Sequence, residues 1–189
     1  MALKLNVIIG STRPGRGGPA VAKWVHEVCE AYPEFDVELV DLAEFNLPLL
    51  DEPNHPRLRK YEHEHTRKWS AVIEPADAFV FVCPEYDYFP NAALVNALQV
   101  LALEWQYKPA AVVSYGGVSG GLRAAQELRL LLGSLAMMAI PQTVPIPFFQ
   151  KQIGDDKVFT PTEAVSDGLK LTLGELVKWA TALKPMRSA

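Results

Sequence analysis

Short strand-like runs alternate with longer amphipathic segments along the whole chain. The runs lie at residues 3–9, 35–40, 78–83, 110–114 and 137–144. The clearest run, AFVFVC, is continuously apolar, as in strands that are buried on both faces of a parallel sheet. The segments between the runs repeat apolar residues every three or four positions, which is the spacing of one helix face. This alternation predicts an α/β fold, a doubly wound parallel sheet with helices on both faces.

Two segments in the pattern need separate treatment. The charged residues 57–70 predict a helix, whereas the three prolines within residues 47–56 predict a loop. The last helix has a distinct start signal: Thr160 as N-cap, Pro161 at the first helical position and Glu163 completing a capping box. No internal repeat or linker divides the chain, so we expect a single domain.

Composition narrows the class of protein. The chain has 189 residues, and its 18 basic and 22 acidic residues give a net charge of −4. A nucleic-acid partner is therefore not expected, because such binding needs a basic face. The two cysteines match neither a disulfide framework nor a metal site. The longest apolar region, residues 128–140, is interrupted by Arg129 and is too short for a membrane span. Lys4 and Asn6 interrupt the short apolar stretch at the start of the sequence, so no secretion signal is expected, and we predict a cytoplasmic protein.

A metal site is not expected either. His55, His63 and His65 lie close together in the sequence. Positions 63 and 65 do not share a helix face, however, since neighbours on a helix are three or four residues apart. The histidines are better explained as part of a solvated helix, and Cys83 as a buried structural thiol.

Three unusual loops follow predicted strands, at residues 10–18, 84–91 and 115–121. In open α/β sheets, ligands bind beyond the carboxyl ends of the strands, near the point where the strand order reverses. The coincidence of three such loops is the strongest functional signal in the sequence.

The first loop, GSTRPGRGG, joins a strand to the start of a helix, where free amides and the helix dipole attract phosphate. Ser11 and Thr12 add hydroxyl groups, and Arg13 adds a guanidinium that can hold two phosphate oxygens. No lysine follows the glycines, which excludes a Walker P-loop. A dinucleotide fingerprint at Gly15, with Asp41 as the ribose acid, is only nominal because Gly15 lies too far beyond the strand. The alternative is a flexible turn with solvated arginines.

The other two loops suit a flat ligand. The loop PEYDYFP carries two prolines and three aromatic residues, which favours a stiff wall beside a planar ring. Its Glu85 and Asp87 resemble a carboxylate pair, but two loop residues leave their relative geometry open. The loop YGGVSGG has four glycines, which permit close approach of the backbone to a ligand or a tight connection.

Together the motifs GSTRPGR, PEYDYFPNAALVNAL and SYGGVSGGLRAAQELR resemble the NADPH-dependent FMN reductase family, and the similarity runs over about residues 4–140. The resemblance implies a single FMN-binding domain over residues 1–189. It implies a flavodoxin-like, five-stranded parallel sheet with strand order 2-1-3-4-5. It also implies FMN as cofactor, with NADPH or NADH as hydride donor.

The resemblance also implies roles for particular residues. A phosphate site would comprise Ser11, Thr12, Arg13, Arg16, Gly17 and Gly18, the last three through their amides. The isoalloxazine ring would lie along Pro84, Glu85, Tyr86, Asp87 and Tyr88. Its other side would be bordered by Ser114, Gly116 and Gly117.

Two departures from the family pattern stand out. The family often has a serine near Gly18, so one hydroxyl donor is missing here. Asp87 replaces the usual asparagine, and its carboxylate would oppose the negative charge that reduction places on the flavin. Either Arg13 or Arg16 offers a partner for the 2′-phosphate of NADPH, which leaves the preference between NADPH and NADH open.

The resemblance implies an FMN-dependent NAD(P)H oxidoreductase that passes electrons by a ping-pong scheme to flavin, quinone, azo or similar acceptors, with no catalytic side chain. An electron carrier of the flavodoxin type and a nucleotide-sensing domain are the alternatives. The family places its flavin sites at a dimer interface. The apolar loop at residues 47–53, with Trp105 and Tyr107, supports a homodimer or homotetramer.

Overall fold

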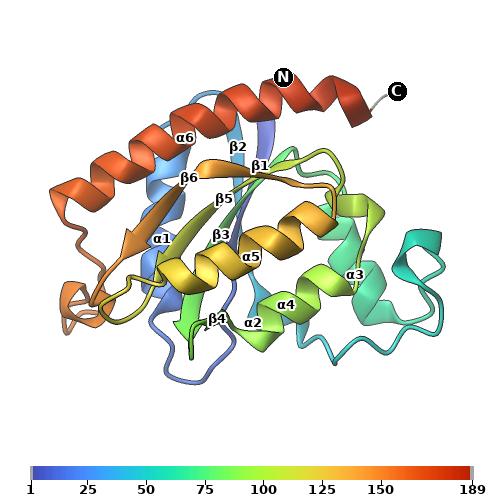
Figure 1. Cartoon of the computed structure of the whole chain (residues 1–189), viewed down its shortest axis with the longest axis horizontal. Helices are drawn as coiled ribbons and strands as arrows, with labels where there is room; N and C mark the ends of the chain where they lie inside the picture. The colour runs from blue at the N-terminus through green and yellow to red at the C-terminus, as the bar shows by residue number, and fades with distance from the viewer. Residues whose placement is uncertain (1, 188–189) are drawn as a thin grey trace.

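A twisted parallel sheet forms the centre of the molecule, whose computed structural model describes residues 2–187 (Figure 1). Its parallel strands are β1 (Leu3–Ile9), β2 (Phe35–Asp41), β3 (Ala78–Tyr86), β5 (Pro109–Tyr115) and β6 (Met138–Ile146). They lie in the order β2-β1-β3-β5-β6, while the short strand β4 (Phe89–Pro90) pairs antiparallel with β3. Counting parallel strands only, this order is 2-1-3-4-5, so the predicted flavodoxin-like sheet is confirmed.

Six α-helices surround the sheet: α1 (Gly18–Glu30), α2 (Leu42–Phe45), α3 (Glu64–Ile73), α4 (Ala92–Gln99), α5 (Leu122–Ser134) and α6 (Glu163–Leu183). Figure 1 shows α4 and α5 in front of the sheet and α1 behind it. No helix in residues 2–187 is both long and apolar enough to cross a membrane.

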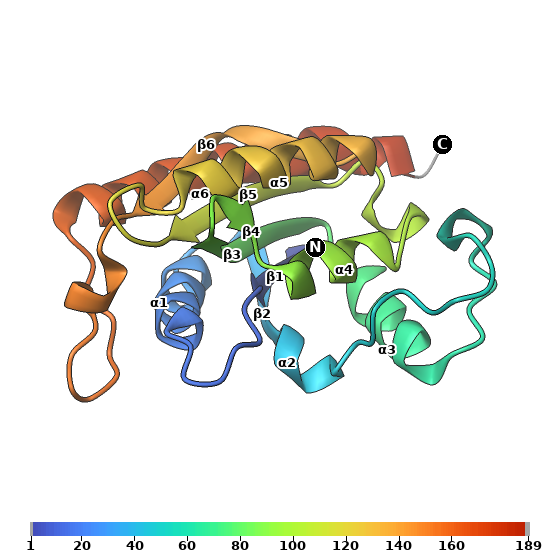
Figure 2. The ribbon, with the colours of Figure 1, turned by 60° about the horizontal axis from the view of Figure 1, so that its bottom comes forward.

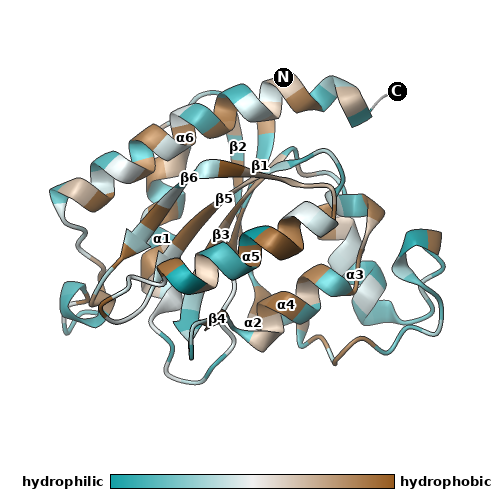
Figure 3. Ribbon diagram, viewed as in Figure 1, coloured by the Kyte–Doolittle hydropathy of each residue, from teal (hydrophilic) through white to brown (hydrophobic). Residues whose placement is uncertain are grey.

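The alternation of side chains along the strands produces two cores. On β3, Val80 and Val82 face the core that α1 and α6 cover, whereas Phe79 and Phe81 face the core under α3, α4 and α5. Trp105 is fully buried in this second core and its indole nitrogen donates to the Leu98 carbonyl. Figure 3 shows the resulting pattern, with apolar central strands and two-sided helices. The predicted exposure of Trp105 to a partner subunit is therefore wrong, because its ring fills the core.

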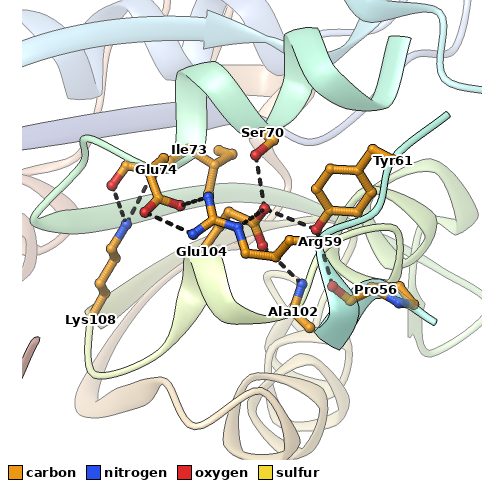
Figure 4. Close-up of polar contacts among 9 residues, drawn as sticks. All are labelled: Pro56, Arg59, Tyr61, Ser70, Ile73, Glu74, Ala102, Glu104 and Lys108. Atoms are coloured by element: carbon orange, nitrogen blue, oxygen red, sulfur yellow. Dashed lines mark hydrogen bonds and ion pairs between the residues drawn. The ribbon is translucent and has the colours of Figure 1, made fainter. Parts of the chain in front are cut away.

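The charged segment before α3 is held by a buried carboxylate (Figure 4). Glu104 accepts hydrogen bonds from the hydroxyls of Tyr61 (2.9 Å) and Ser70 (2.8 Å), and Arg59 lies 3.5 Å away. The Lys108 ammonium group donates to two carbonyls at the end of α3. Burial lowers the pKa of Lys108 to about 8. This network fixes the 56–63 segment against the domain.

Two predicted helix starts are wrong. The helix predicted over residues 57–70 begins only at Glu64, because Arg59 adopts a left-handed backbone (φ 52°) and its side chain joins the Glu104 network. The last helix has Thr162 as N-cap instead of Thr160. The amide of Thr160 is bonded to the Gln152 carbonyl, which keeps that residue in the preceding loop.

Candidate functional site

The three candidate loops meet at the carboxyl edge of the neighbouring strands β1, β3 and β5, which Figure 2 brings forward. Hydrogen bonds join them to one another. The Ser11 and Tyr86 hydroxyls are 3.0 Å apart, and the Ser119 hydroxyl donates to Glu85 at 2.7 Å. The side-chain amide of Asn91 donates to the Gly10 carbonyl at 2.6 Å. The sequence-predicted residues are thus brought together at one edge of the sheet.

The first loop ends at the start of α1, which no side chain caps. Gly17 occupies the N-cap position, and Thr12 and Arg13, earlier in the same loop, are exposed. The first amides of a helix have no carbonyl partner within the helix and carry partial positive charge. An uncapped helix start with an exposed hydroxyl and guanidinium is chemically suited to a phosphate group.

The side chain of Arg16 is used within the protein. Its guanidinium donates to the Ser11 carbonyl and pairs with Asp41 at 2.5 Å. The Arg16 amide donates to the Arg13 carbonyl, which closes a turn in the loop. Asp41 also accepts a hydrogen bond from the Ala43 amide at the start of α2. These contacts make Arg16 a brace for the loop and explain Asp41 without a ribose.

Gly17 and Gly18 are required by packing. A Cβ atom on Gly17 would lie 2.6 Å from the Phe149 ring, and one on Gly18 would lie 2.6 Å from the Tyr115 hydroxyl. The Tyr115 and Phe149 rings contact each other edge-on, with centroids 4.7 Å apart. The start of α1 therefore packs directly against these two aromatic rings.

Tyr115 is a residue that the sequence-based prediction missed. It is 3% exposed, and its hydroxyl group forms no hydrogen bond. Burial raises the pKa of this hydroxyl above its usual value. The sequence did contain a signal for it: a tyrosine at the last position of a buried strand places a hydroxyl group near the loop edge.

The second loop forms a hairpin between β3 and β4. Asp87 (φ 50°) and Tyr88 (φ 76°) occupy its two central positions. Positive φ at both positions is the geometry of a type I′ turn. Tyr86, Tyr88 and Phe89 are 37%, 61% and 59% exposed. The hairpin therefore presents aromatic rings to solvent next to the phosphate loop.

Two arginines lie over these rings. The Arg123 guanidinium is 4.3 Å from the centre of the Tyr88 ring, and that of Arg13 is 5.7 Å from Tyr86. Cation–π contacts of this kind hold aromatic rings in place. The hairpin is thereby joined to the first loop through Arg13 and to the first turn of α5 through Arg123.

Glu85 has a structural role. Its carboxylate accepts hydrogen bonds from the Ser119 hydroxyl and from the amides of Arg123 (3.0 Å) and Ala124 (3.3 Å). Burial raises the pKa of Glu85, but these hydrogen bonds outweigh burial and hold it below its usual value. Glu85 therefore caps α5. Asp87 is exposed in the turn, so the geometry gives no support to acid–base work by the two carboxylates.

In the third loop, the glycines with strict conformational demands are Gly120 (φ 63°) and Gly121 (φ 80°). A Cβ atom on Gly121 would lie 2.6 Å from the Tyr115 backbone nitrogen. Ser114 is buried and its hydroxyl donates to the Gly120 carbonyl, so it holds the loop in shape. Gly117 has open space around it, and Gly116 packs against the backbone of Gly121.

No group of histidine, cysteine or acidic side chains in the described part of the chain is arranged to hold a metal ion. His63 and His65 stack with ring centroids 5.2 Å apart, and the His65 ring nitrogen lies 3.0 Å from Asp51. Cys83 is fully buried, and burial raises its pKa to about 12, so its thiol is a structural group.

A doubly wound sheet with a phosphate-suited helix start and an aromatic hairpin at the switch point defines a mononucleotide-binding protein of the flavodoxin-like class. A model of the family "NADPH-dependent FMN reductase" matches residues 3–151. The chain belongs to this family, and the expected class, an oxidoreductase that uses FMN and NAD(P)H, is confirmed.

Similar proteins agree with this assignment. The chain is 43% identical over 144 residues to the NAD(P)H-dependent FMN reductase of Schizosaccharomyces pombe, covering 75% of this chain and 71% of that one. It is 36% identical over 189 residues to the NAD(P)H-dependent FMN reductase ntnL of a Nectria species, covering 96% and 89%. Its fold matches the flavoenzyme NAD(P)H:(acceptor) oxidoreductase FerB of Paracoccus denitrificans with a TM-score of 0.73, at 23% identity and 96% and 99% coverage.

The residues present fit FMN. A 5′-phosphate needs several hydrogen-bond donors, and the loop offers the first amides of α1, the Thr12 hydroxyl and the Arg13 guanidinium. The buried Tyr115 hydroxyl beside them has no protein partner. The exposed rings of the hairpin provide the flat, largely apolar contact that a flavin ring requires.

Proposed function

We propose that the three loops bind one FMN and that the protein serves NAD(P)H and a second electron acceptor in turn at that site, by a ping-pong scheme. The observation that carries the proposal is the uncapped start of α1 beside an exposed aromatic hairpin at the switch point of the sheet. Family membership supports the cofactor and the hydride donor.

In this proposal the phosphate is bound by Thr12, Arg13 and the amides of Gly17 and Gly18. Ser11, which the sequence also suggested for the phosphate, is buried, and its hydroxyl pairs with that of Tyr86. Arg16 acts indirectly, because its side chain and amide stabilise the loop through Asp41 and internal carbonyls. The helix start and one guanidinium would hold the phosphate and so orient the bound cofactor. No catalytic side chain is needed for this role.

The hairpin supplies the ring site. Pro84 to Tyr88 flank the isoalloxazine, with Glu85 contributing backbone groups because its carboxylate is committed to α5. Gly116 and Gly117 border the opposite side, where the open space around the exposed Gly117 leaves room for a flat ring. Ser114 supports this border from below through Gly120.

When bound, FMN supplies the chemistry: it accepts a hydride from NAD(P)H and delivers electrons to the second substrate. The protein's own contribution is to hold the ring on a solvent-exposed surface that planar molecules can approach. Flavins, quinones and azo compounds are planar acceptors of this kind. NADPH and NADH are both proposed as donors, since the Arg16–Asp41 pair removes one candidate for recognition of the 2′-phosphate.

We also propose a homodimer. Five exposed apolar residues gather on the hairpin, the third loop and α5: Tyr88, Phe89, Val118, Leu122 and Leu130. An apolar surface of this kind favours contact with a second copy. A second patch at Leu49 and Leu50 on the loop before α3 is available for a dimer of dimers.

Light scattering tests the assembly. We expect at least twice the chain mass of 20.9 kDa for the wild type. Leu130→Glu places a charge on the proposed contact and should lower the measured mass, while Leu171→Glu, on the distant and equally exposed face of α6, should not. A wild-type monomer at working concentration would contradict the dimer.

The proposed reaction is tested by mixing the FMN-loaded protein with NADPH in the absence of oxygen. We expect loss of the visible absorbance of the oxidised flavin, and its return when a quinone is added. Bound FMN that NAD(P)H does not bleach would favour a non-enzymatic carrier, and a protein that binds no FMN would favour a nucleotide-sensing domain.

A further inference from the structure

The hydroxyl group of Tyr115 is one of seven buried side-chain polar atoms without a hydrogen-bond partner in the described part of the structure, and it lies at the loop edge of the sheet. The residue is 3% exposed, yet the hydroxyl forms no hydrogen bond to the protein. Its ring is fixed by edge-on contact with Phe149. Buried polar groups are nearly always paired, because an unpaired hydroxyl keeps its desolvation cost without compensation. An unpaired one at a binding edge points to a partner that is not part of the chain.

The position of this hydroxyl relates it to the first residue of α1. It lies 2.6 Å from the point where a Cβ atom on Gly18 would stand, and the ring carbon that carries it lies 3.5 Å from that point. The hydroxyl thus fills the space that a side chain at position 18 would occupy.

The surroundings favour an anion as the missing partner. The start of α1 is uncapped. Around the Tyr115 hydroxyl, burial, Tyr86 and Cys83 disfavour the charged form, whereas Ser11 and Arg16 favour it. Burial dominates and raises the pKa of Tyr115, so the hydroxyl keeps its proton at neutral pH and can donate it. The Ser11 hydroxyl itself is engaged with Tyr86.

We propose that the Tyr115 hydroxyl donates a hydrogen bond to the phosphate of FMN at the start of α1. This inference rests on the proposed FMN site. It adds a phosphate-binding residue from β5, outside the phosphate loop, and explains why Gly18 carries no side chain.

Tyr115→Phe removes the hydroxyl and keeps the ring. We expect its dissociation constant for FMN to rise about tenfold, the size of one hydrogen bond to a charged group. Riboflavin lacks the phosphate, so its dissociation constant should stay the same. Without FMN, the variant should unfold at the same or a higher temperature than the wild type, because the lost hydroxyl had no partner. Tyr32→Phe, whose hydroxyl bonds a carbonyl on α6, is the matched control and should leave both ligands unaffected.

A swap tests the relation between positions 18 and 115. Gly18→Ser alone should weaken FMN binding, because its Cβ meets the Tyr115 hydroxyl at 2.6 Å. In the Tyr115→Phe background the nearest atoms are at 3.5 Å or more, so the serine fits and returns a hydroxyl to the same place. The double variant should therefore bind FMN more tightly than either single variant.

The outcomes separate this inference from the proposed function. If the wild type binds no FMN, the proposed function fails. If the wild type binds FMN and Tyr115→Phe binds it equally well, or loses FMN and riboflavin in equal proportion, the inference on Tyr115 is overturned while the FMN site stands. A double variant no better than Tyr115→Phe would mean that a hydroxyl in this space does not bind the phosphate, and it would overturn the placement of the Tyr115 hydroxyl at the phosphate.

Discussion

The helices α1 and α5 both start at the loop edge of the sheet. The N-cap residue of each is a glycine, which has no side chain to cap the helix. Their first turns differ in what they bind. The α5 amides of Arg123 and Ala124 are bonded to Glu85, which reaches them from the neighbouring strand. The start of α1 has no such carboxylate and has the exposed Arg13 beside it.

The difference shows that some polar groups at one sheet edge stabilise the fold, while others remain available to bind a ligand. A helix start that a buried carboxylate caps is electrostatically complete, and a second anion there would be repelled. A helix start left uncapped beside a guanidinium keeps its attraction for an anion from solution. The phosphate is therefore expected at α1 and not at α5, although both lie at the same edge.

The largest expected effect concerns the loop before α5. Gly121→Ala introduces a Cβ at positive φ within 2.6 Å of the Tyr115 backbone nitrogen. We expect the free energy of unfolding to fall by about 2–4 kcal/mol, combining left-handed strain with overpacking. Gly117→Ala, with open space around its Cβ, is the control and should change stability little. Equal losses in urea titrations of both variants would contradict the assignment of rigidity to Gly121.

The next effect concerns the start of α1. Arg13→Ala should weaken FMN binding by about 1.5–3 kcal/mol, the range for a hydrogen bond to a charged group. The free energy of unfolding should stay nearly constant, since Arg13 is exposed and its guanidinium contacts the Tyr86 ring. Titrations with FMN and riboflavin measure the difference. Equal losses for both ligands would mean that Arg13 acts through the hairpin instead of the phosphate.

Glu85→Gln sharpens the contrast at α5. Loss of the capping charge should lower the free energy of unfolding by about 1 kcal/mol near neutral pH, as for other helix caps. The folded state depresses the pKa of Glu85, so its stabilisation is present above the unfolded carboxyl pKa and is lost as pH falls through the folded value. The difference between wild type and variant should therefore shrink under acidic conditions. A difference independent of pH would show that the charge of Glu85 is not what stabilises α5.

The smallest effect concerns Asp87 in the turn. If its carboxylate faces the flavin, Asp87→Asn removes a negative charge and the two-electron potential should rise, by about 30 mV for each 1.4 kcal/mol of relieved repulsion. Because Asp87 is exposed, the shift should be small and should decrease in high salt. Asparagine also suits the positive φ of this position, so folding should be unimpaired. An unchanged potential would show that the carboxylate points away from the flavin.

Much of the fold follows from the sequence because the strands are buried on both faces and carry a strong apolar signal. The predicted strands 3–9 and 110–114 agree with β1 and β5 to within a residue at each end. The start of α3 could not be predicted, since it depends on Glu104 binding Tyr61 from 43 residues away. Long-range contacts of this kind leave no local pattern.

The candidate site was predictable at the level of loops and not of individual side chains. The motif spacing placed Ser11 and Tyr86 at one edge, where their hydroxyls meet. The roles of Glu85 and Arg16 depend on partners in other elements, so sequence proximity to the loops was misleading. Tyr115 was overlooked because its role depends on the missing side chain of Gly18, a relation visible only in three dimensions.

Equilibrium dialysis of the purified wild type against FMN and, in parallel, against riboflavin tests the central claim most directly. A phosphate site at the start of α1 predicts FMN binding at micromolar protein and riboflavin binding at least about tenfold weaker, since several charge-assisted hydrogen bonds are lost. Equal affinity for the two ligands would contradict the phosphate site, and absence of FMN binding would contradict the whole functional account.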